Sequence, residues 1–230
     1  MSEAKRDYFY ERFDHASTLA RDGQIITGHL EAESSSFVRF NHGKIRQPGN
    51  VEQSRLTLEL IDGRKHTRGT MMLSGTPSTD DGAIKALVED LQAQVEHLPE
   101  DPHHLYNTVP SSSESISDAT LASAQAITSD VLEAAAELDL VGILAHGTIE
   151  SGFANSLGQR NWFSKPSFNL DWSIYSHGDK AVKSGYSGAN WDQAIFKGKL
   201  EQGRQQLELL GRPAKTISPG AYRAYLSPAA

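Results

Sequence analysis

The sequence predicts an α+β protein, in which an antiparallel sheet, or two such sheets, carries helices packed on one face. Three observations lead to this fold class. Apolar residues recur at helical spacing near the start of each half, a two-residue alternation follows, and a second helical pattern closes the half. The order helix, antiparallel meander, helix therefore occurs twice, over residues 1–98 and 118–218, without a repeat of the sequence itself.

Helical periodicity opens and closes the first half. A helix is predicted over residues 8–21, where Gly23 ends it, and an amphipathic helix begins near residues 77–81 and is stopped by Pro99 and Pro102. The apolar residues that carry these two patterns are Phe9, Phe13, Ala16, Ala20, Ala83, Leu87, Leu91 and Val95.

Between these helices the period changes to two, which is typical of half-buried strands. Asp62-Gly63 is the strongest hairpin signal in the chain, and Asn41-His42-Gly43 is a second turn. The predicted strands of this half are residues 25–32, 36–40, 44–47, 56–60 and 64–73.

The second half follows a stretch at residues 99–117 that is rich in Pro, Ser and His and lacks periodicity, which predicts a linker or long loop. Ser117 or Asp118 is the expected cap of the next helix, and Gly211 with Pro213 closes the last one. The predicted helices are residues 118–135 and 190–210, and the predicted strands are residues 140–146, 150–155, 160–164, 167–176 and 180–186.

Residues 219–230 are expected to start a strand that leads into a C-terminal region absent from this chain. Ser218-Pro219-Gly220 forms a turn, and a strand is predicted over Tyr222–Leu226, but no partner strand follows it. An ordinary edge strand at the end of a complete domain is the alternative interpretation.

Composition excludes several functions. The chain has 230 residues and a net charge of −7, which disfavours a nucleic-acid partner because phosphates are repelled. It has no cysteine, so disulfides, thiol nucleophiles and cysteine-bound zinc are excluded. Residues 1–14 lack the apolar core of a signal peptide, and the longest apolar run, residues 140–145, is too short for a membrane span. A cytoplasmic protein without a membrane partner is expected.

No complete catalytic or metal motif is present in the sequence. His103 and His104 are adjacent, and the side chains of adjacent residues in a loop or strand tend to diverge, so solvated linker residues are the favoured interpretation. His146 and Glu150 are four apart, but the glycines around them indicate a strand rather than a helix. The HExxH and HExxxH patterns are absent. We therefore predict no catalytic, cofactor-binding or metal-binding residue in this chain.

Serines and aromatic residues give weaker signals. No G-x-S-x-G elbow occurs in the sequence. Ser151-Gly152 and Ser184-Gly185 are interpreted as turns or bulges. A hydrolase that uses His146, Glu150 and a nearby serine remains an alternative. A cluster of aromatic residues more often fills a core, and the other options are base stacking and an open sheet edge that accepts an extended peptide. The cluster consists of Trp162, Trp172, Tyr175 and Tyr186.

Several segments are informative together, through their order and spacing. They are Phe37–Phe40 with Gly43–Gln47, Asp62–Arg64, Gly152–Gly158, Leu170–Tyr175, Asp179–Gly188 and Pro219–Leu226. In this order they resemble the TldD/PmbA family over nearly the whole chain. The ending Leu226–Ala230 looks more like the metal-free branch of that family.

The resemblance implies a longer protein, with an N-terminal α+β region and a C-terminal β-rich region. Two kinds of subunit pair in this family. One carries an HExxxH motif and is a zinc-type metallopeptidase acting on unfolded or small peptides, and the other supports it. This chain would then be the N-terminal part of such a protein and would form a homo- or hetero-oligomer with a related subunit. Any zinc would lie in the partner subunit or in the missing C-terminal region. A free-standing, non-enzymatic binding or assembly module is the alternative.

Overall fold

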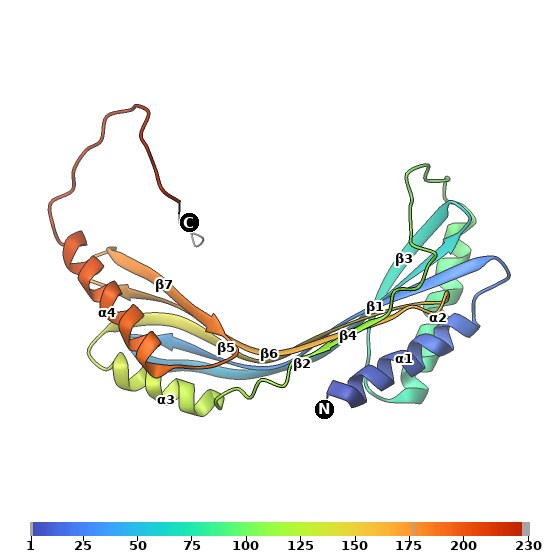
Figure 1. The fold of residues 1–230 in the computed structure, drawn as a ribbon, viewed down its shortest axis with the longest axis horizontal. Helices are drawn as coiled ribbons and strands as arrows, with labels where there is room; N and C mark the ends of the chain where they lie inside the picture. The colour runs from blue at the N-terminus through green and yellow to red at the C-terminus, as the bar shows by residue number, and fades with distance from the viewer. Residues whose placement is uncertain (1, 177, 227–230) are drawn as a thin grey trace.

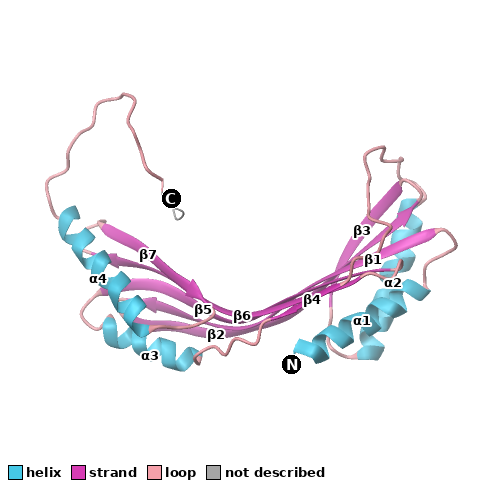
Figure 2. Ribbon diagram, in the orientation of Figure 1, coloured by secondary structure: helices cyan, strands magenta, loops and turns pink. Residues whose placement is uncertain are grey.

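The structure is a computed structural model that describes residues 2–176 and 178–226, and it consists of one arched sheet with helices along it (Figures 1 and 2). Within these residues the sheet has seven strands. The elements in chain order are α1 (Ser2–Thr18), β1 (Gln24–Asn41), β2 (Lys44–Asp62), β3 (Lys65–Met72), α2 (Pro77–Val95), β4 (Ser113–Ile116), α3 (Ala124–Ala134), β5 (Asp139–Asn155), β6 (Arg160–Tyr175), β7 (Ala181–Gly188) and α4 (Gln193–Leu210).

One sheet joins the two halves of the chain. The strand order is β3-β2-β1-β5-β6-β4, and β7 pairs with β6 beside this path. All neighbours are antiparallel except β4 and β6. The strands β1 and β5 pair from Thr27 opposite Asn155 to Phe40 opposite Gly142. The predicted α+β class and the repeated order of helix, meander and helix are confirmed, and the two meanders form one sheet.

Four strands are longer than the sequence predicts. β1, β2, β5 and β6 have 18, 19, 17 and 16 residues, and each contains two segments that were predicted as separate strands. The division was wrong because the apolar alternation fails at the middle of each strand while the backbone pairing continues. Hydrogen bonding between strands, and not side-chain polarity, sustains the extended chain there.

The four helices of the described residues cover the same face of the sheet, as predicted. On β1, β5 and β6 the even-numbered residues point to this face, and at both ends of the strands they are buried. Two separate cores result, each near the helices of its own half. The first contains Phe9, Phe13, Leu30, Leu56, Leu58, Ile84, Leu91 and Trp162, and the second contains Phe40, Val131, Leu144, Phe168, Leu170, Trp172, Ile174 and Phe196.

Three local predictions need correction. The helix α3 begins at Ala124, because Ser123, and not Ser117 or Asp118, accepts a hydrogen bond from the Ala126 amide at 3.1 Å. The predicted loop at residues 99–117 contains the short strand β4, which pairs in parallel with β6. Residues 222–226 are exposed and form no strand, because no neighbouring strand in the described part of the chain supplies hydrogen-bond partners. Residues 227–230 lie outside the described residues.

Every helix within residues 2–176 and 178–226 is too short or too polar to span a lipid bilayer.

Asp80 fixes the start of α2 and connects it to α1. Its buried carboxylate accepts hydrogen bonds from the Tyr8 hydroxyl at 2.6 Å, the Ser74 amide at 2.9 Å and the Gly75 amide at 3.0 Å. Burial alone would raise the pKa of Asp80, but these hydrogen bonds outweigh it and hold the pKa below its usual 3.8. Burial, with Asp80 beside it, raises the pKa of Tyr8 to about 12.

We expect Asp80→Asn to lower the free energy of unfolding by about 2 kcal/mol at pH 7, because an amide nitrogen cannot accept from the Ser74 and Gly75 amides. Since the folded pKa of Asp80 is depressed, its contribution is present above the unfolded pKa and is lost as the pH falls through the folded value, below about pH 4. Urea unfolding of both proteins at pH 7 and pH 3 tests this. Asp90→Asn, at an exposed site on the same helix, should change stability by less than about 0.5 kcal/mol.

Candidate functional site

The middle of the sheet is polar on the side that the helices cover elsewhere. Ser34 and Ser36 on β1 lie beside His146, Thr148 and Glu150 on β5, at positions that alternation would give to the core. We call this region the waist. Its helix-facing residues are Ser34, Ser36, Glu52, His146, Thr148, Glu150 and Ser164.

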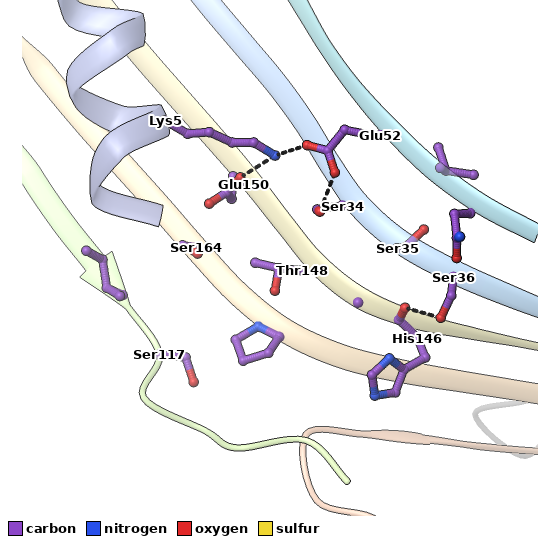
Figure 3. Close-up of a pocket in the computed structure, with 15 residues that line it drawn as sticks. Lys5, Ser34, Ser35, Ser36, Glu52, Ser117, His146, Thr148, Glu150 and Ser164 are labelled. Atoms are coloured by element: carbon purple, nitrogen blue, oxygen red, sulfur yellow. Dashed lines mark hydrogen bonds and ion pairs between the residues drawn. The ribbon is translucent and has the colours of Figure 1, made fainter. Parts of the chain in front are cut away.

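The waist forms the floor of a pocket of about 570 Å³. Lys5 of α1 lines one side of the pocket, and Ser117, just after β4, lines the other (Figure 3). Ile116 also contributes to the lining. The pocket therefore lies between the two cores, where neither pair of helices covers the sheet.

Lys5 joins two carboxylates in this pocket. Its Nζ lies 2.8 Å from Glu52 Oε1 and 3.3 Å from Glu150 Oε2 (Figure 3). Burial alone would lower the pKa of Lys5, but Glu52 and Glu150 outweigh it and raise the pKa above 10.5. The hydrogen bond from Lys5, followed by that from Ser34, holds the pKa of Glu52 below its usual 4.5. Glu150 is only 3% exposed, so its charge depends on Lys5 for compensation.

Gly147 allows β1 and β5 to approach closely at the waist. A Cβ atom at this position would lie 2.3 Å from the Ser34 carbonyl oxygen and 2.4 Å from Ser35 Cα. Both are backbone atoms, so a side chain at position 147 would have to push the two strands apart. The close approach of β1 and β5 thus occurs at the position of the pocket.

The structure brings His146 and Glu150 to the same pocket but does not assemble a hydrolase site from them. His146 Nε2 lies 2.7 Å from the Ala122 carbonyl oxygen, so the ring donates to the backbone before α3. Ser36 contacts His146 only through the backbone carbonyl, at 3.5 Å. In the described part of the chain, no serine hydroxyl is hydrogen-bonded to the His146 ring, which leaves the serine hydrolase hypothesis without a nucleophile and base pair at this position.

The structure also shows where the other serines and the aromatic residues considered in the sequence lie. Ser151-Gly152 and Ser184-Gly185 lie within β5 and β7 and pair with β6 without a shift in register, so the turns or bulges predicted there are wrong. Ser151 Oγ is 3.2 Å from His29 Nε2 on the face without helices. Trp162 and Trp172 are buried in the two cores and Tyr186 packs against the second, as the favoured interpretation expects. The interpretation was wrong for Tyr175, which is 38% exposed.

His104 is not a free linker residue. Its ring stacks on His66 of β3 with 3.9 Å between ring centroids, and His66 Nδ1 lies 2.9 Å from Glu59 Oε1. The sequence pointed to His103 and His104 but not to His66 and Glu59. The Asp62-Gly63 hairpin contained a signal, because its register puts positions 59 and 66 on one face of neighbouring strands.

The opposite face of the sheet has no helix over it within residues 2–176 and 178–226, and it forms the concave side of the arch (Figure 2). Large apolar side chains are exposed on it among charged ones, and the Glu31–Arg55 ion pair lies across β1 and β2 on this face. The exposed apolar residues of this face are Met72, Ile143, Ile149, Phe163 and Tyr175.

No family model matches the sequence, and no curated protein sequence matches it. Solved structures do match the fold. TldE from Thermococcus kodakarensis superposes with a TM-score of 0.66 at 10% identity, over 87% of this chain and 47% of that one. A proposed modulator of a DNA gyrase from Thermotoga maritima gives 0.64 at 12% identity, over 92% and 50%. A similar protein from Bacteroides thetaiotaomicron gives 0.55 at 13% identity, over 86% and 48%.

These matches define the class of the fold, which is that of TldE and of the two proposed modulators of DNA gyrase. The resemblance to the TldD/PmbA family that the sequence indicates is thus borne out at the level of the fold. The chain spans about half the length of the structures it matches.

We expect Lys5→Met to lower the free energy of unfolding by about 2 kcal/mol at pH 7, because it leaves Glu150 buried without its cation. The raised pKa of Lys5 means that its contribution is complete below the unfolded value and declines only as the pH rises above about 10.5. Chemical denaturation at pH 7 measures the change. Lys85→Met, which removes an exposed pair with Glu89 at 3.9 Å, should cost less than about 0.5 kcal/mol.

We also expect Gly147→Ala to destabilise the protein by about 1–3 kcal/mol, since the added methyl group meets backbone that cannot move freely. Thermal unfolding followed by circular dichroism reports the loss. Gly82→Ala is the matched control, because a Cβ there meets nothing within 4 Å and the site is helical. This control should be neutral or stabilising by about 0.5–1 kcal/mol, and equal losses in both variants would contradict the role assigned to Gly147.

Proposed function

We propose that this chain is the N-terminal part of a TldD/PmbA-like protein of the metallopeptidase family. It assists the proteolysis of unfolded or small peptides by assembly and peptide guidance, and catalysis is located elsewhere. The observation that carries the proposal is the helix-free, concave face of the arched sheet. The likeness of the fold to TldE supports the family context of the proposal.

The concave face has the dimensions and chemistry for an extended chain. A strand of 18 residues is about 60 Å long, and β1 runs along the middle of the sheet. Ile149 and Phe163 are 55% and 43% exposed on this face. Separate apolar side chains among charged ones suit peptides of varied sequence. Such a surface offers apolar contact area without requiring a particular order of side chains in the peptide.

The open edge of β2 offers a second mode of contact. β3 pairs with Arg55–Asp62, and the Leu73 amide after it donates to the Ser54 carbonyl oxygen, so in the described part of the chain residues 44–53 have a partner strand on one side only. Pro48 lies in this segment, which is compatible with a sheet edge because proline has no N–H to donate. An extended peptide could therefore add to this edge through main-chain hydrogen bonds.

The remaining parts of the proposal concern partners. A related subunit forms a homo- or hetero-oligomer with this chain, and zinc, where it is used for peptide cleavage, is held by that subunit or by a region outside this chain. The setting is cytoplasmic, and neither a nucleic acid nor a membrane is a partner. The net charge of −7 supports the exclusion of nucleic acid.

Binding without cleavage by this chain alone is the expected result. A short, unstructured, fluorescein-labelled peptide is titrated with the 230-residue chain, and binding is followed by fluorescence anisotropy. Mass spectrometry then measures whether the peptide stays intact in the presence and in the absence of zinc chloride. Ile149→Asp should weaken binding about tenfold, since it removes an apolar contact worth about 1.5 kcal/mol. Ile195→Asp is the matched control, because Ile195 is 48% exposed on α4, away from the concave face.

Each part of the proposal can fail separately. Cleavage of the peptide by the purified chain would overturn the location of catalysis elsewhere. Absence of binding, or equal weakening by Ile149→Asp and Ile195→Asp, would overturn peptide guidance and leave the assembly module as the better function.

A further inference from the structure

The turn end of the β2–β3 hairpin is covered by the loop that follows α2. The Asp101 amide donates to the Arg64 carbonyl oxygen at 2.9 Å, and the Arg64 guanidinium donates to the Pro102 carbonyl oxygen at 2.6 Å. These bonds bring His104 onto His66, on the helix-free face of the hairpin. Residues that are far apart in the sequence thus form one cluster.

The cluster combines two imidazoles with two carboxylates. His66 Nδ1 lies 2.9 Å from Glu59 Oε1, and His66 Nε2 lies 3.4 Å from Asp101 Oδ2. One ligand atom each from Glu59, His66 and His104 lies within 4.8 Å of the others. The Asp101 carboxylate is held in place by a hydrogen bond from the His103 amide at 2.8 Å.

His104 has an unused ligand atom in this cluster. Its Nε2 is buried and has no hydrogen-bond partner among the described residues. Leaving a buried polar atom without a partner costs free energy. A ligand that bonds to His104 Nε2 would remove this cost, which favours its binding. Imidazole nitrogen and carboxylate oxygen together are the ligand set that zinc and neighbouring transition metals prefer.

We propose that Glu59, His66 and His104 bind a divalent transition-metal cation such as zinc, with Asp101 as a further ligand or as the hydrogen-bond partner that orients His66. The cation would clamp the loop after α2 to the β2–β3 hairpin. This site is structural, and it is independent of the peptide guidance proposed above. It uses none of the residues of the waist.

Binding requires one local movement. The rings of His66 and His104 are stacked with 15° between their planes, so their lone pairs do not converge, whereas a metal ion lies in the plane of each ring that binds it. No hydrogen bond holds His104 Nε2 in its present orientation within the described part of the chain. His104 lies in a loop and can therefore turn toward the ion that His66 and Glu59 share.

Isothermal titration of the tag-free, 230-residue chain with zinc chloride tests the site. We expect saturable binding of one ion, and a loss of affinity of about tenfold or more in His66→Ala and in His104→Ala. His103→Ala is the matched control, because His103 is the exposed neighbour of His104 and supplies only its backbone amide to Asp101. This variant should bind as the unchanged protein does. Affinity should also fall in acid, because protons compete for the imidazole nitrogens.

A second measurement separates metal binding from a change in fold. The melting temperature of the unchanged chain and of His103→Ala should rise when zinc is added, and those of His104→Ala and Glu59→Gln should rise less or not at all. Far-UV circular dichroism without zinc confirms that each variant is folded. The proposal is overturned if the unchanged chain shows no saturable binding, or if His66→Ala and His104→Ala bind zinc as tightly as His103→Ala.

Discussion

The pairing of β1 with β5 is the interaction on which the rest of the structure depends. The two strands come from different halves of the chain, and their ladder runs from Thr27 and Asn155 to Phe40 and Gly142 without a shift in register. Each half alone would be a three-stranded meander with two helices. Because the ladder crosses both cores, the halves share one curved sheet, and the face without helices becomes a single continuous surface.

The waist is the consequence of joining two helical layers along one sheet. The helices of each half cover only their own end of the long strands, so the helix-facing positions between them remain accessible to solvent. Hydroxyl and charged side chains are suited to such positions, since apolar ones would be exposed to water. Glu150 is the buried carboxylate of the waist, at 3% exposed, and Lys5 reaches it from α1. The ion pair thereby connects the first helix to the second meander.

Local periodicity was enough to predict the order of the helices and the two meanders. Leu56, Leu58 and Leu60 mark a strand by themselves, and the Asp62-Gly63 turn marks its hairpin. The continuity of the long strands could not be predicted in the same way, because the evidence for a strand at Ser34–Ser36 lies in the backbone of β2 and β5, which are distant in sequence. The strand β4 was missed for the same reason, since four residues become a strand only through β6.

The candidate sites also could be predicted only in part, because they depend on contacts between residues that are distant in sequence. His146 and Glu150 were recognised as a pair, but only the structure gives each its partner, the Ala122 carbonyl for one and Lys5 for the other. The meeting of His66 and His104 depends on how the loop after α2 folds back, and Arg64 directs that return through two hydrogen bonds. No spacing of histidines in the sequence encodes such a path.

The two faces of the sheet meet different physical demands. The helix side supplies the burial that stabilises the fold, so its positions are apolar wherever a helix lies above them. The concave side cannot be uniformly apolar, because a wide exposed hydrophobic surface favours aggregation. Charged residues such as Glu31 and Arg55 separate its apolar side chains, and the surface remains compatible with water while still offering apolar contacts. A surface of this kind suits partners that bind and leave, and it is less suited to a permanent, dry interface, which would require a continuous apolar centre.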